Sequence, residues 1–239
     1  MVSDFDKSLV EKYIPVNKQK KALKKLEKNY PIQYLIGDVD FYGCKILVNK
    51  NVLIPRFETE ELVSETINYI NKMNKNVKII DIGTGSGCIG ITLKRELKNA
   101  KVTLVDISKK ALNVARKNKK NLDIKLLKSN LFEKVNGKYD VIISNPPYIS
   151  YNEEIMDIVK NNEPNIALFA DNEGLYYYEE ILKSCKDYLN DEYLIAFEIG
   201  ATQKDKIIAL VNKYLPNSNI ISKKDMQGRD RMIFIMNKK

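Results

Sequence analysis

Apolar residues change their spacing along the chain, and each change predicts a different kind of element. In residues 1–30 they return every three or four positions on both sides of Pro15, which predicts two short amphipathic helices. Residues 31–53 alternate apolar and polar positions around Gly43, which predicts a β-hairpin that links the two parts of the chain. Helical spacing resumes after Pro55 and predicts one amphipathic helix.

Beyond Asn76, strand-like and helix-like patterns alternate to the end of the chain. This order predicts an α/β fold with a doubly wound, mostly parallel, Rossmann-like sheet over residues 54–239. In such sheets, ligands bind at the carboxyl ends of the strands near the point where the strand order reverses. The seven segments that we expect to form the sheet are VKIID, KVTLVD, IKLLKS, YDVIIS, EYLIAFEI, SNIISKK and RMIFIMN.

Composition narrows the class of protein. The hydrophobic fraction of 44% supports a sizeable core, and no apolar run approaches the roughly 18 residues that cross a bilayer. The first residues, MVSDFDKSLVEKY, lack the apolar stretch of a signal peptide. We therefore expect a soluble, cytoplasmic protein. The net charge of +9 favours anionic partners, but Lys, Asn and Ile are abundant throughout, which fits a general bias better than a nucleic-acid face.

Two residue types limit the chemistry. The chain has no histidine, which excludes Ser-His-Asp and Cys-His catalysis and any metal site built on imidazole. Its three cysteines, Cys44, Cys88 and Cys185, form no CxxC pair, so we expect buried reduced thiols and no metal. The chemistry must depend on carboxylates, amides, hydroxyls, lysines or a cofactor.

The first strand of the sheet ends in a glycine loop, DIGTGSGCIG. The loop fits the dinucleotide fingerprint G-x-G-x-x-G, and it also resembles the D-x-G-x-G-x-G loop with which class I methyltransferases bind S-adenosylmethionine. Free N–H groups at the start of the following helix suit either a pyrophosphate or a methionine carboxylate. We place Asp81 at the mouth of the loop, where it would repel a pyrophosphate and suit an ammonium group. This favours the methyltransferase interpretation.

The next two strands each end in residues suited to a nucleoside. Asp106 could accept hydrogen bonds from both ribose hydroxyls, with the alternative that it caps the following helix. Asn130 and Leu131 would lie beside an adenine, with an ordinary loop as the alternative. The predicted cofactor-binding residues are Asp81, Gly83, Thr84, Gly85, Ser86, Gly87, Asp106, Ile107, Asn130, Leu131 and Asn145.

The fourth strand ends abruptly in SNPPY. Pro146 has no N–H for the sheet, and it holds Asn145 in an extended conformation. Asn145 Oδ1 and the Pro146 carbonyl would then accept both hydrogens of a planar –NH2 group. These bonds strengthen as the nitrogen attacks a methyl group and gains positive character, which is the condition for catalysis. Tyr148 would offer a flat face to the same group.

The SNPPY stretch resembles the (D/N/S)-PP-(Y/F/W) signature of methyltransferases that act on amino groups of bases or on glutamine. Further segments resemble the release factor glutamine methyltransferase family: YPIQYLIGDVDFYG, VLIPRFETEELV, NEP, GLYYYEEIL, FEIGATQ and GRDRMI. The resemblance implies methyl transfer from S-adenosylmethionine to the glutamine of the Gly-Gly-Gln motif in bacterial-type peptide chain release factors. It implies a catalytic role for Asn145, Pro146 and Tyr148, and substrate binding by these residues together with Pro147, Arg56 and Glu58.

The chain departs from the family pattern at three points. Phe57 and Asn130 stand where the family usually has Pro and Asp, and the helical segment of residues 1–30 is shorter than the family's N-terminal domain.

We expect a monomer without a membrane partner. The main alternative is a nucleic-acid adenine-N6 methyltransferase, for which we find no segment long enough to flip a base. A ribosomal-protein glutamine methyltransferase and a non-enzymatic dinucleotide-binding module are further alternatives, opposed by IPRFETE and SNPPY respectively.

Overall fold

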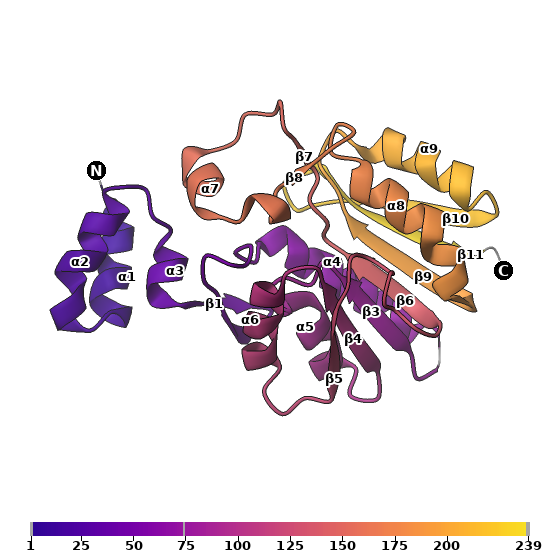
Figure 1. Ribbon diagram of the computed structural model, residues 1–239, viewed down its shortest axis with the longest axis horizontal. Coiled ribbons are helices and arrows are strands. Elements are labelled where there is room, and N and C mark those ends of the chain that lie inside the picture. The colour runs from indigo at the N-terminus through magenta and orange to yellow at the C-terminus, as the bar shows by residue number, and fades with distance from the viewer. Residues whose placement is uncertain (1, 74, 238–239) are drawn as a thin grey trace.

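The computed structural model describes residues 2–73 and 75–237. Its N-terminal segment is a small group of helices (Figure 1). Helices α1 (Asp4–Tyr13) and α2 (Val16–Leu26) lie on either side of Pro15, as predicted. A third helix, α3 (Ile32–Ile36), was not expected and begins directly after Pro31, a residue favoured at a helix start. The three helices share a small apolar cluster of their own.

The predicted hairpin follows. Strands β1 (Asp38–Phe41) and β2 (Cys44–Leu47) pair antiparallel, and both turn residues, Tyr42 and Gly43, have positive φ. The hairpin packs on the main core rather than on the N-terminal helices, because its inward residues join the larger apolar cluster. Asn118 fastens it there: its side chain exchanges hydrogen bonds of 2.8 and 2.9 Å with the backbone of Leu47.

A seven-stranded sheet forms the centre of the molecule, with strand order β10-β11-β9-β6-β3-β4-β5. Pairs among β9, β6, β3, β4 and β5 are parallel, whereas β10 and β11 join antiparallel at one edge. The prediction of a mostly parallel, doubly wound sheet is confirmed. The strands are β3 (Lys78–Ile82), β4 (Lys101–Asp106), β5 (Ile124–Lys128), β6 (Tyr139–Ser144), β9 (Leu189–Glu198), β10 (Ser218–Lys224) and β11 (Asp230–Asn237).

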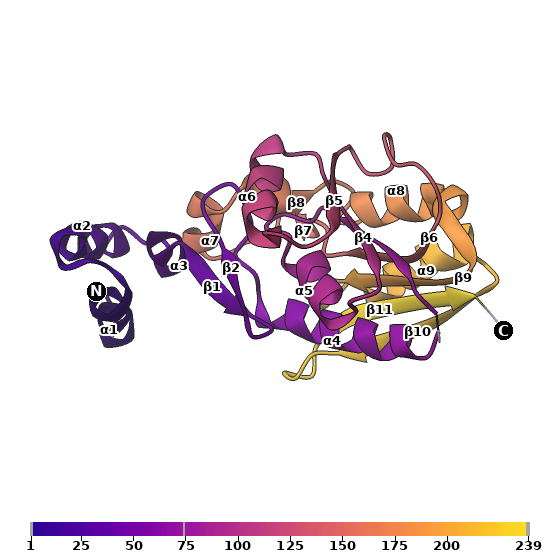
Figure 2. The same ribbon diagram turned by 90° about the horizontal axis from the view of Figure 1, so that it is seen from below.

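Helices cover both faces of this sheet (Figures 1 and 2). Alternate residues of each strand face opposite ways. Ile79 of β3 therefore joins the cluster on one face, and Ile80 joins the cluster on the other. The first face is covered by α4 (Phe57–Asn71), α5 (Cys88–Glu96) and α6 (Lys109–Lys119), and the second by α8 (Tyr176–Ser184) and α9 (Lys204–Tyr214). The three cysteines are buried free thiols, as expected.

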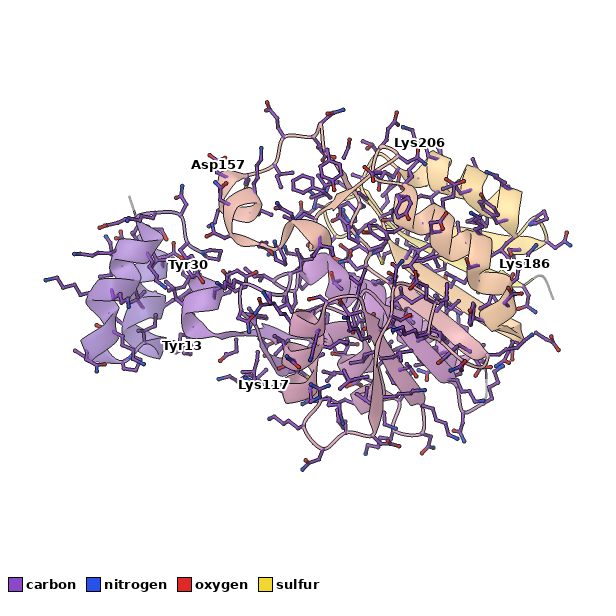
Figure 3. All side chains as sticks on the ribbon, viewed as in Figure 1. Tyr13, Tyr30, Lys117, Asp157, Lys186 and Lys206 are labelled. Atoms are coloured by element: carbon purple, nitrogen blue, oxygen red, sulfur yellow. The ribbon has the colours of Figure 1, made fainter. Side chains whose placement is uncertain are left out.

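The chain makes an unpredicted excursion between β6 and α8. It contains the two-residue strands β7 (Ile149–Ser150) and β8 (Phe169–Ala170), helix α7 (Asp157–Asn162) and a 3-10 turn (Asn165–Ala167). The Asn162 amide donates to the carbonyl of Asn29 at 2.9 Å, so the excursion reaches back to the N-terminal helices. Figure 3 labels Tyr30 and Asp157 in these two parts. None of the helices formed by residues 2–73 and 75–237 is long and apolar enough to cross a membrane.

Candidate active site

A cleft opens at the carboxyl ends of β3, β4 and β6, where the strand order reverses as predicted. Next to it lies a groove, bordered by the excursion between β6 and α8 and by the start of α3. Asn145 lines both spaces, so it stands at their junction. The predicted residues that line the cleft are Gly83, Thr84, Gly85, Ser86, Asp106, Ile107, Asn130, Leu131, Asn145, Pro146 and Pro147. Tyr148 and Arg56 line the groove.

The glycine loop turns sharply between β3 and α5. Gly83, Gly85 and Gly87 all have positive φ, at 71°, 56° and 84°, which a residue with a Cβ adopts only at a cost. At Gly87 a Cβ would also meet the Ile91 side chain at 2.8 Å. The loop therefore depends on its glycines to reach α5 and leave free N–H groups at the start of that helix.

Asp81 does not stand at the mouth of the loop, and that expectation is wrong. The side chain is fully buried beneath the loop, and Asp81 is not among the described residues that line the cleft. Its Oδ2 accepts from the Thr84 hydroxyl at 2.5 Å and from the Gly90 N–H at 3.1 Å. Burial raises the pKa of Asp81 to about 7. The carboxyl group thus braces the loop from below, because it is the acceptor that two loop donors share.

Asp106 has the position predicted for a ribose ligand. Its Oδ2 accepts from the Gly85 N–H and its Oδ1 from the Ser108 N–H, each at 2.8 Å. Each carboxylate oxygen keeps a further lone pair for a ligand. Desolvation raises the pKa of this carboxyl group, against the two backbone hydrogen bonds. The capping alternative is wrong, because Ser108 is the N-cap of α6 and accepts from the Ala111 N–H.

Beside Asp106 the cleft becomes apolar. Ile107 is 47% exposed, although it is a large hydrophobic residue, and Leu131 lines the same space with a positive φ of 43°. Asn130 donates through Nδ2 to Glu133 at 2.7 Å, which leaves its Oδ1 for a ligand. Apolar side chains, a carboxylate and the free N–H groups at the start of α5 are the partners that an adenosine joined to an amino acid requires. The residues present therefore fit S-adenosylmethionine.

The SNPPY stretch is fixed at the edge of β6. The Ser144 hydroxyl donates to the Ile82 carbonyl at 2.7 Å, which ties the end of β6 to β3. The Asn145 Nδ2 donates to the Thr59 hydroxyl at 3.2 Å, and that hydroxyl donates to Glu198 Oε2 at 2.6 Å. Among the hydrogen bonds of the described residues, the carboxamide thus uses its nitrogen, and its oxygen is left for a ligand in the cleft.

Tyr148 follows the end of β6 and lines the groove, and both its backbone carbonyl and its side-chain hydroxyl have partners. Its carbonyl accepts from Gln203 Nε2 at 2.8 Å, and its hydroxyl lies 3.5 Å from Glu198 Oε1. Burial, together with the charge of Glu198, raises the pKa of Tyr148 far above its ordinary value. The phenol therefore stays neutral at physiological pH and presents a ring rather than an anion to the groove.

Glu198 is the buried carboxyl group that connects these residues. It ends β9 and is 1% exposed. Burial raises the pKa of Glu198 to about 7, against the Thr59 hydrogen bond and the charge of Arg231, which lower it. Glu198 belongs to the family segment FEIGATQ, and no other feature of the sequence indicates that it lies at the site.

Arg56 lines the groove and forms an ion pair with Glu163, whose side chain is 2% exposed. Glu163 also accepts from the Ile54 N–H at 2.9 Å, so one buried carboxylate holds the segment before α4. The NEP segment contains Glu163, but nothing in the sequence pairs it with Arg56. Arg56 thus borders the site and has a structural partner as well.

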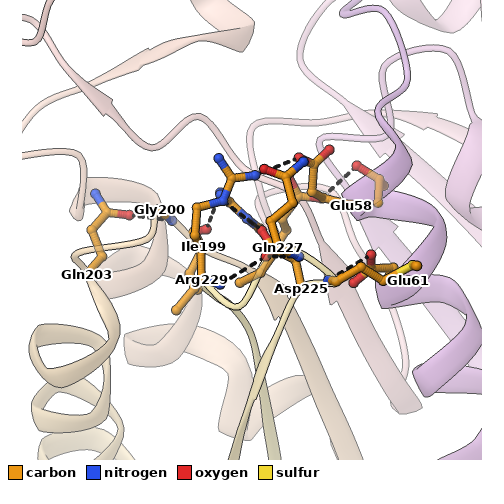
Figure 4. A network of polar contacts seen from close by, with 12 residues as sticks. Glu58, Glu61, Ile199, Gly200, Gln203, Asp225, Gln227 and Arg229 are labelled. Atoms are coloured by element: carbon orange, nitrogen blue, oxygen red, sulfur yellow. Dashed lines mark hydrogen bonds and ion pairs between the residues drawn. The ribbon is translucent and has the colours of Figure 1, made fainter.

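Glu58 lies in a different polar network, shown in Figure 4. Its carboxylate pairs with Arg229 at 3.1 Å, and Arg229 pairs in turn with Asp225 at 3.1 Å. Glu61 accepts from the backbone of the same β10–β11 turn at 3.2 Å. Glu58 is not among the described residues that line the cleft or the groove. Its contacts tie α4 to the antiparallel edge of the sheet.

Sequence reasoning did not assign several residues that the fold brings to the cleft. Thr59, Pro164 and Tyr177 belong to the family segments VLIPRFETEELV, NEP and GLYYYEEIL, so all three had a family signal. Ile166 comes from the excursion, and nothing in the sequence indicates that it reaches the cleft. Among the additional lining residues are Thr59, Ser144, Pro164, Ile166 and Tyr177.

Comparisons with known proteins agree with this geometry. The family model of the methyltransferase small domain matches residues 59–162. A release factor glutamine methyltransferase of Streptococcus pneumoniae is 43% identical over 214 residues, which cover 88% of this chain and 76% of that protein. Its counterpart from Flavobacterium psychrophilum is 42% identical over 222 residues, which cover 89% and 77%.

A solved structure adds the fold. The release factor-specific protein-(glutamine-N5) methyltransferase of Alicyclobacillus acidocaldarius superposes with a TM-score of 0.51 at 25% identity. The superposition covers 80% of this chain and 99% of that one. The likeness therefore extends over most of the chain.

Proposed function

Because the chain belongs to the release factor glutamine methyltransferase family, we propose that it methylates the side-chain amide nitrogen of the glutamine in the Gly-Gly-Gln motif of bacterial-type peptide chain release factors. The observation that carries this proposal is the place of Asn145. It stands where the cleft meets the groove, with Nδ2 held by Thr59 and Oδ1 left for a ligand.

The cleft holds the methyl donor. S-adenosylmethionine supplies a methyl group on a positively charged sulfur. Asp106 accepts from the ribose hydroxyls, and Ile107 and Leu131 cover the adenine. The loop from Gly83 to Gly87 positions the start of α5, whose N–H groups face the amino-acid end. Asp81 supports this loop from beneath, since it binds Thr84 and Gly90 rather than solvent.

The groove takes the glutamine side chain. Asn145 Oδ1 and the Pro146 carbonyl accept the two amide hydrogens and hold the nitrogen in one orientation. As the nitrogen gains positive character, its hydrogens become more acidic and both hydrogen bonds strengthen. The Tyr148 ring packs against the planar amide and excludes water. Fixing the nitrogen in line with the methyl group supplies the rest of the acceleration.

The rest of the groove would receive the protein substrate. It is lined by Arg56, by the start of α3 and by a segment that runs into α7, so three separate segments border the path to Asn145. The residues of the third segment are Glu154, Ile155, Met156, Ile158 and Val159. We propose that the enzyme acts as a monomer. We place it in the cytoplasm, where translation terminates.

A methyl-transfer assay with labelled S-adenosylmethionine tests the proposal. The acceptors are a release factor, the same factor with the motif glutamine changed to alanine, and duplex DNA. We expect label on the unchanged factor and none on the other two. Label on DNA alone would favour the adenine-N6 alternative, and equal label on both forms of the factor would place the methyl group elsewhere.

A further inference from the structure

We propose that Thr59 is a positioning residue, which takes its orientation from the Glu198 carboxylate and fixes the Asn145 carboxamide with Oδ1 toward the cleft. The inference rests on the proposed function, because it concerns the acceptor that holds the substrate amide. Thr59 is the third residue of α4 and is 2% exposed. It bonds to Glu198 at 2.6 Å and to Asn145 at 3.2 Å.

We call the two hydrogen bonds that join Glu198, Thr59 and Asn145 the relay. Which atom donates in each bond follows from the single hydrogen of the Thr59 hydroxyl. A charged carboxylate only accepts, so Glu198 takes the single hydrogen of the Thr59 hydroxyl. The hydroxyl oxygen then has only lone pairs to offer to Asn145. The Nδ2 end of the carboxamide must face Thr59, and Oδ1 must face the other way. With the carboxamide turned over, two oxygens would meet without a hydrogen between them.

The relay solves a problem that the SNPPY stretch leaves open. The two prolines fix the backbone at Asn145, but the two ends of its carboxamide have almost the same shape. Only the end that accepts can hold an amide –NH2 group. Glu198 and Thr59 lie far from Asn145 in sequence, so the fold supplies the choice of end.

A double-mutant cycle separates positioning from a merely structural tie between α4 and β9. Turnover is measured with the release factor above about pH 8, where a carboxyl group of pKa near 7 is charged. Asn145→Ala should lower kcat by about 100-fold. Thr59→Val should lower kcat by about 10-fold in the wild-type background and by less than about 2-fold when Asn145 is already alanine.

Two variants control for the loss of a buried hydroxyl. Thr59→Ser keeps the hydroxyl and should stay within about 3-fold of wild-type turnover. Thr66→Val removes the hydroxyl of another fully buried threonine of α4, whose partner among residues 2–73 and 75–237 is the Leu62 carbonyl of its own helix at 2.7 Å. It should leave kcat unchanged. If Thr59→Val does not fold, Thr59→Ala replaces it in the cycle.

A second measurement needs no turnover. The side-chain N–H signals of Asn145 in an NMR spectrum are assigned by their loss in Asn145→Ala. In the wild-type protein and in Thr59→Ser they should exchange slowly with water, because Thr59 accepts one of them. In Thr59→Val they should exchange at least about 10-fold faster, as expected of a side-chain donor without a partner.

The outcomes distinguish this inference from the proposed function. An equal loss of kcat from Thr59→Val in both backgrounds, a Thr59→Ser variant as slow as Thr59→Val, or unchanged Asn145 exchange in Thr59→Val would each overturn the positioning role. Full turnover in Asn145→Ala would overturn the catalytic role of Asn145 and the positioning role of Thr59 with it. No methylation of release factors by the wild-type protein would instead overturn the proposed function.

Discussion

Gly174 lies so close to the backbone of Tyr148 that a Cβ on Gly174 would stand 2.0 Å from the Tyr148 carbonyl oxygen. Gln203 secures the same contact, because its Nε2 donates to the carbonyls of Tyr148 and Glu173 at 2.8 and 3.2 Å. The turn before α8 thus holds the end of the SNPPY stretch from outside. It fixes where Tyr148 stands in the groove.

Gly174→Ala should therefore reduce both stability and turnover. The alanine would suffer a positive φ of 81° and would push the Tyr148 carbonyl away. We expect a loss of at least about 3 kcal/mol in the free energy of unfolding, measured with urea, and a fall in kcat of at least about 10-fold.

Gly137→Ala is the matched control, since Gly137 has a nearly equal φ of 83° and a Cβ added there would meet no atom within 4 Å. It should lose only about 1 kcal/mol, from backbone strain alone, and should keep its turnover. Equal losses in the two variants would show that the contact with Tyr148 contributes nothing.

Asp106→Ala should weaken cofactor binding. The change removes the proposed acceptor for the ribose hydroxyls and also frees the Gly85 N–H of the loop. Calorimetric titration with S-adenosylmethionine should give a Kd raised by about 10- to 100-fold, the usual value of a hydrogen bond to a charged group. Asp123→Ala, at an exposed aspartate before β5, should bind as tightly as the wild-type protein. A Kd unchanged by Asp106→Ala would exclude this residue as a ribose ligand.

Asp81 should make the stability of the fold depend on pH. Its pKa is about 7 in the folded protein and 3.8 when exposed, so between these values the folded state binds a proton that the unfolded state has lost. The contribution of Asp81 to the free energy of unfolding is therefore fully present below about pH 4 and is lost as the pH rises through 7. Asp106, whose charge raises the pKa further, and the donors Thr84 and Gly90 are the groups that face it.

Asp81→Asn removes this dependence, so its unfolding free energy should improve relative to wild type between pH 4 and pH 8, by on the order of 4 kcal/mol. Urea denaturation at each pH measures the difference. Asp205→Asn, at an exposed position in α9, should show no such trend. A constant difference between Asp81→Asn and wild type would mean that Asp81 is charged throughout this range.

Arg56→Ala should destabilise the fold because it leaves the buried Glu163 carboxylate with the Ile54 N–H as its remaining partner. We expect a loss of about 3 kcal/mol in the free energy of unfolding, because removing one partner of a buried ion pair leaves the other charge buried without compensation. Lys206→Ala breaks an exposed pair with Glu173 and should leave the free energy of unfolding nearly unchanged, because water screens the two charges. Similar small losses from both changes would leave Arg56 free for a role in substrate binding alone.

The sequence predicted the sheet domain well because each of its signals is local. Apolar spacing distinguishes strand from helix within a few residues, and the glycine loop and SNPPY each follow a strand directly. The rule that ligands bind at the strand ends then sufficed to bring Gly85, Asp106 and Asn145 into one cleft. The short strands and helix between β6 and α8 were missed, since they are held by contacts with distant segments rather than by a pattern of their own.

The errors at the site have the same origin. A carboxylate after a strand can face a ligand or the interior, and spacing does not distinguish the two. Asp81 lies under the loop because it accepts hydrogen bonds from Thr84 and Gly90 there, whereas Asp106 faces the cleft. Glu58 was expected at the substrate and instead pairs with Arg229, because α4 lies against the β10–β11 turn.

The sequence by itself determined the strands of the central sheet, the helices that cover it, the cofactor loop and the rigid backbone at Asn145, since each depends on residues that are neighbours in the chain. Only the tertiary structure decided which side chains complete the site. Thr59 of α4 bonds to Asn145 and to Glu198 of β9, although the three residues lie far apart in sequence. Glu163 forms the ion pair with Arg56. Hydrogen-bond partners of buried polar groups are set by which surfaces pack together, and the order of residues along the chain does not contain that information.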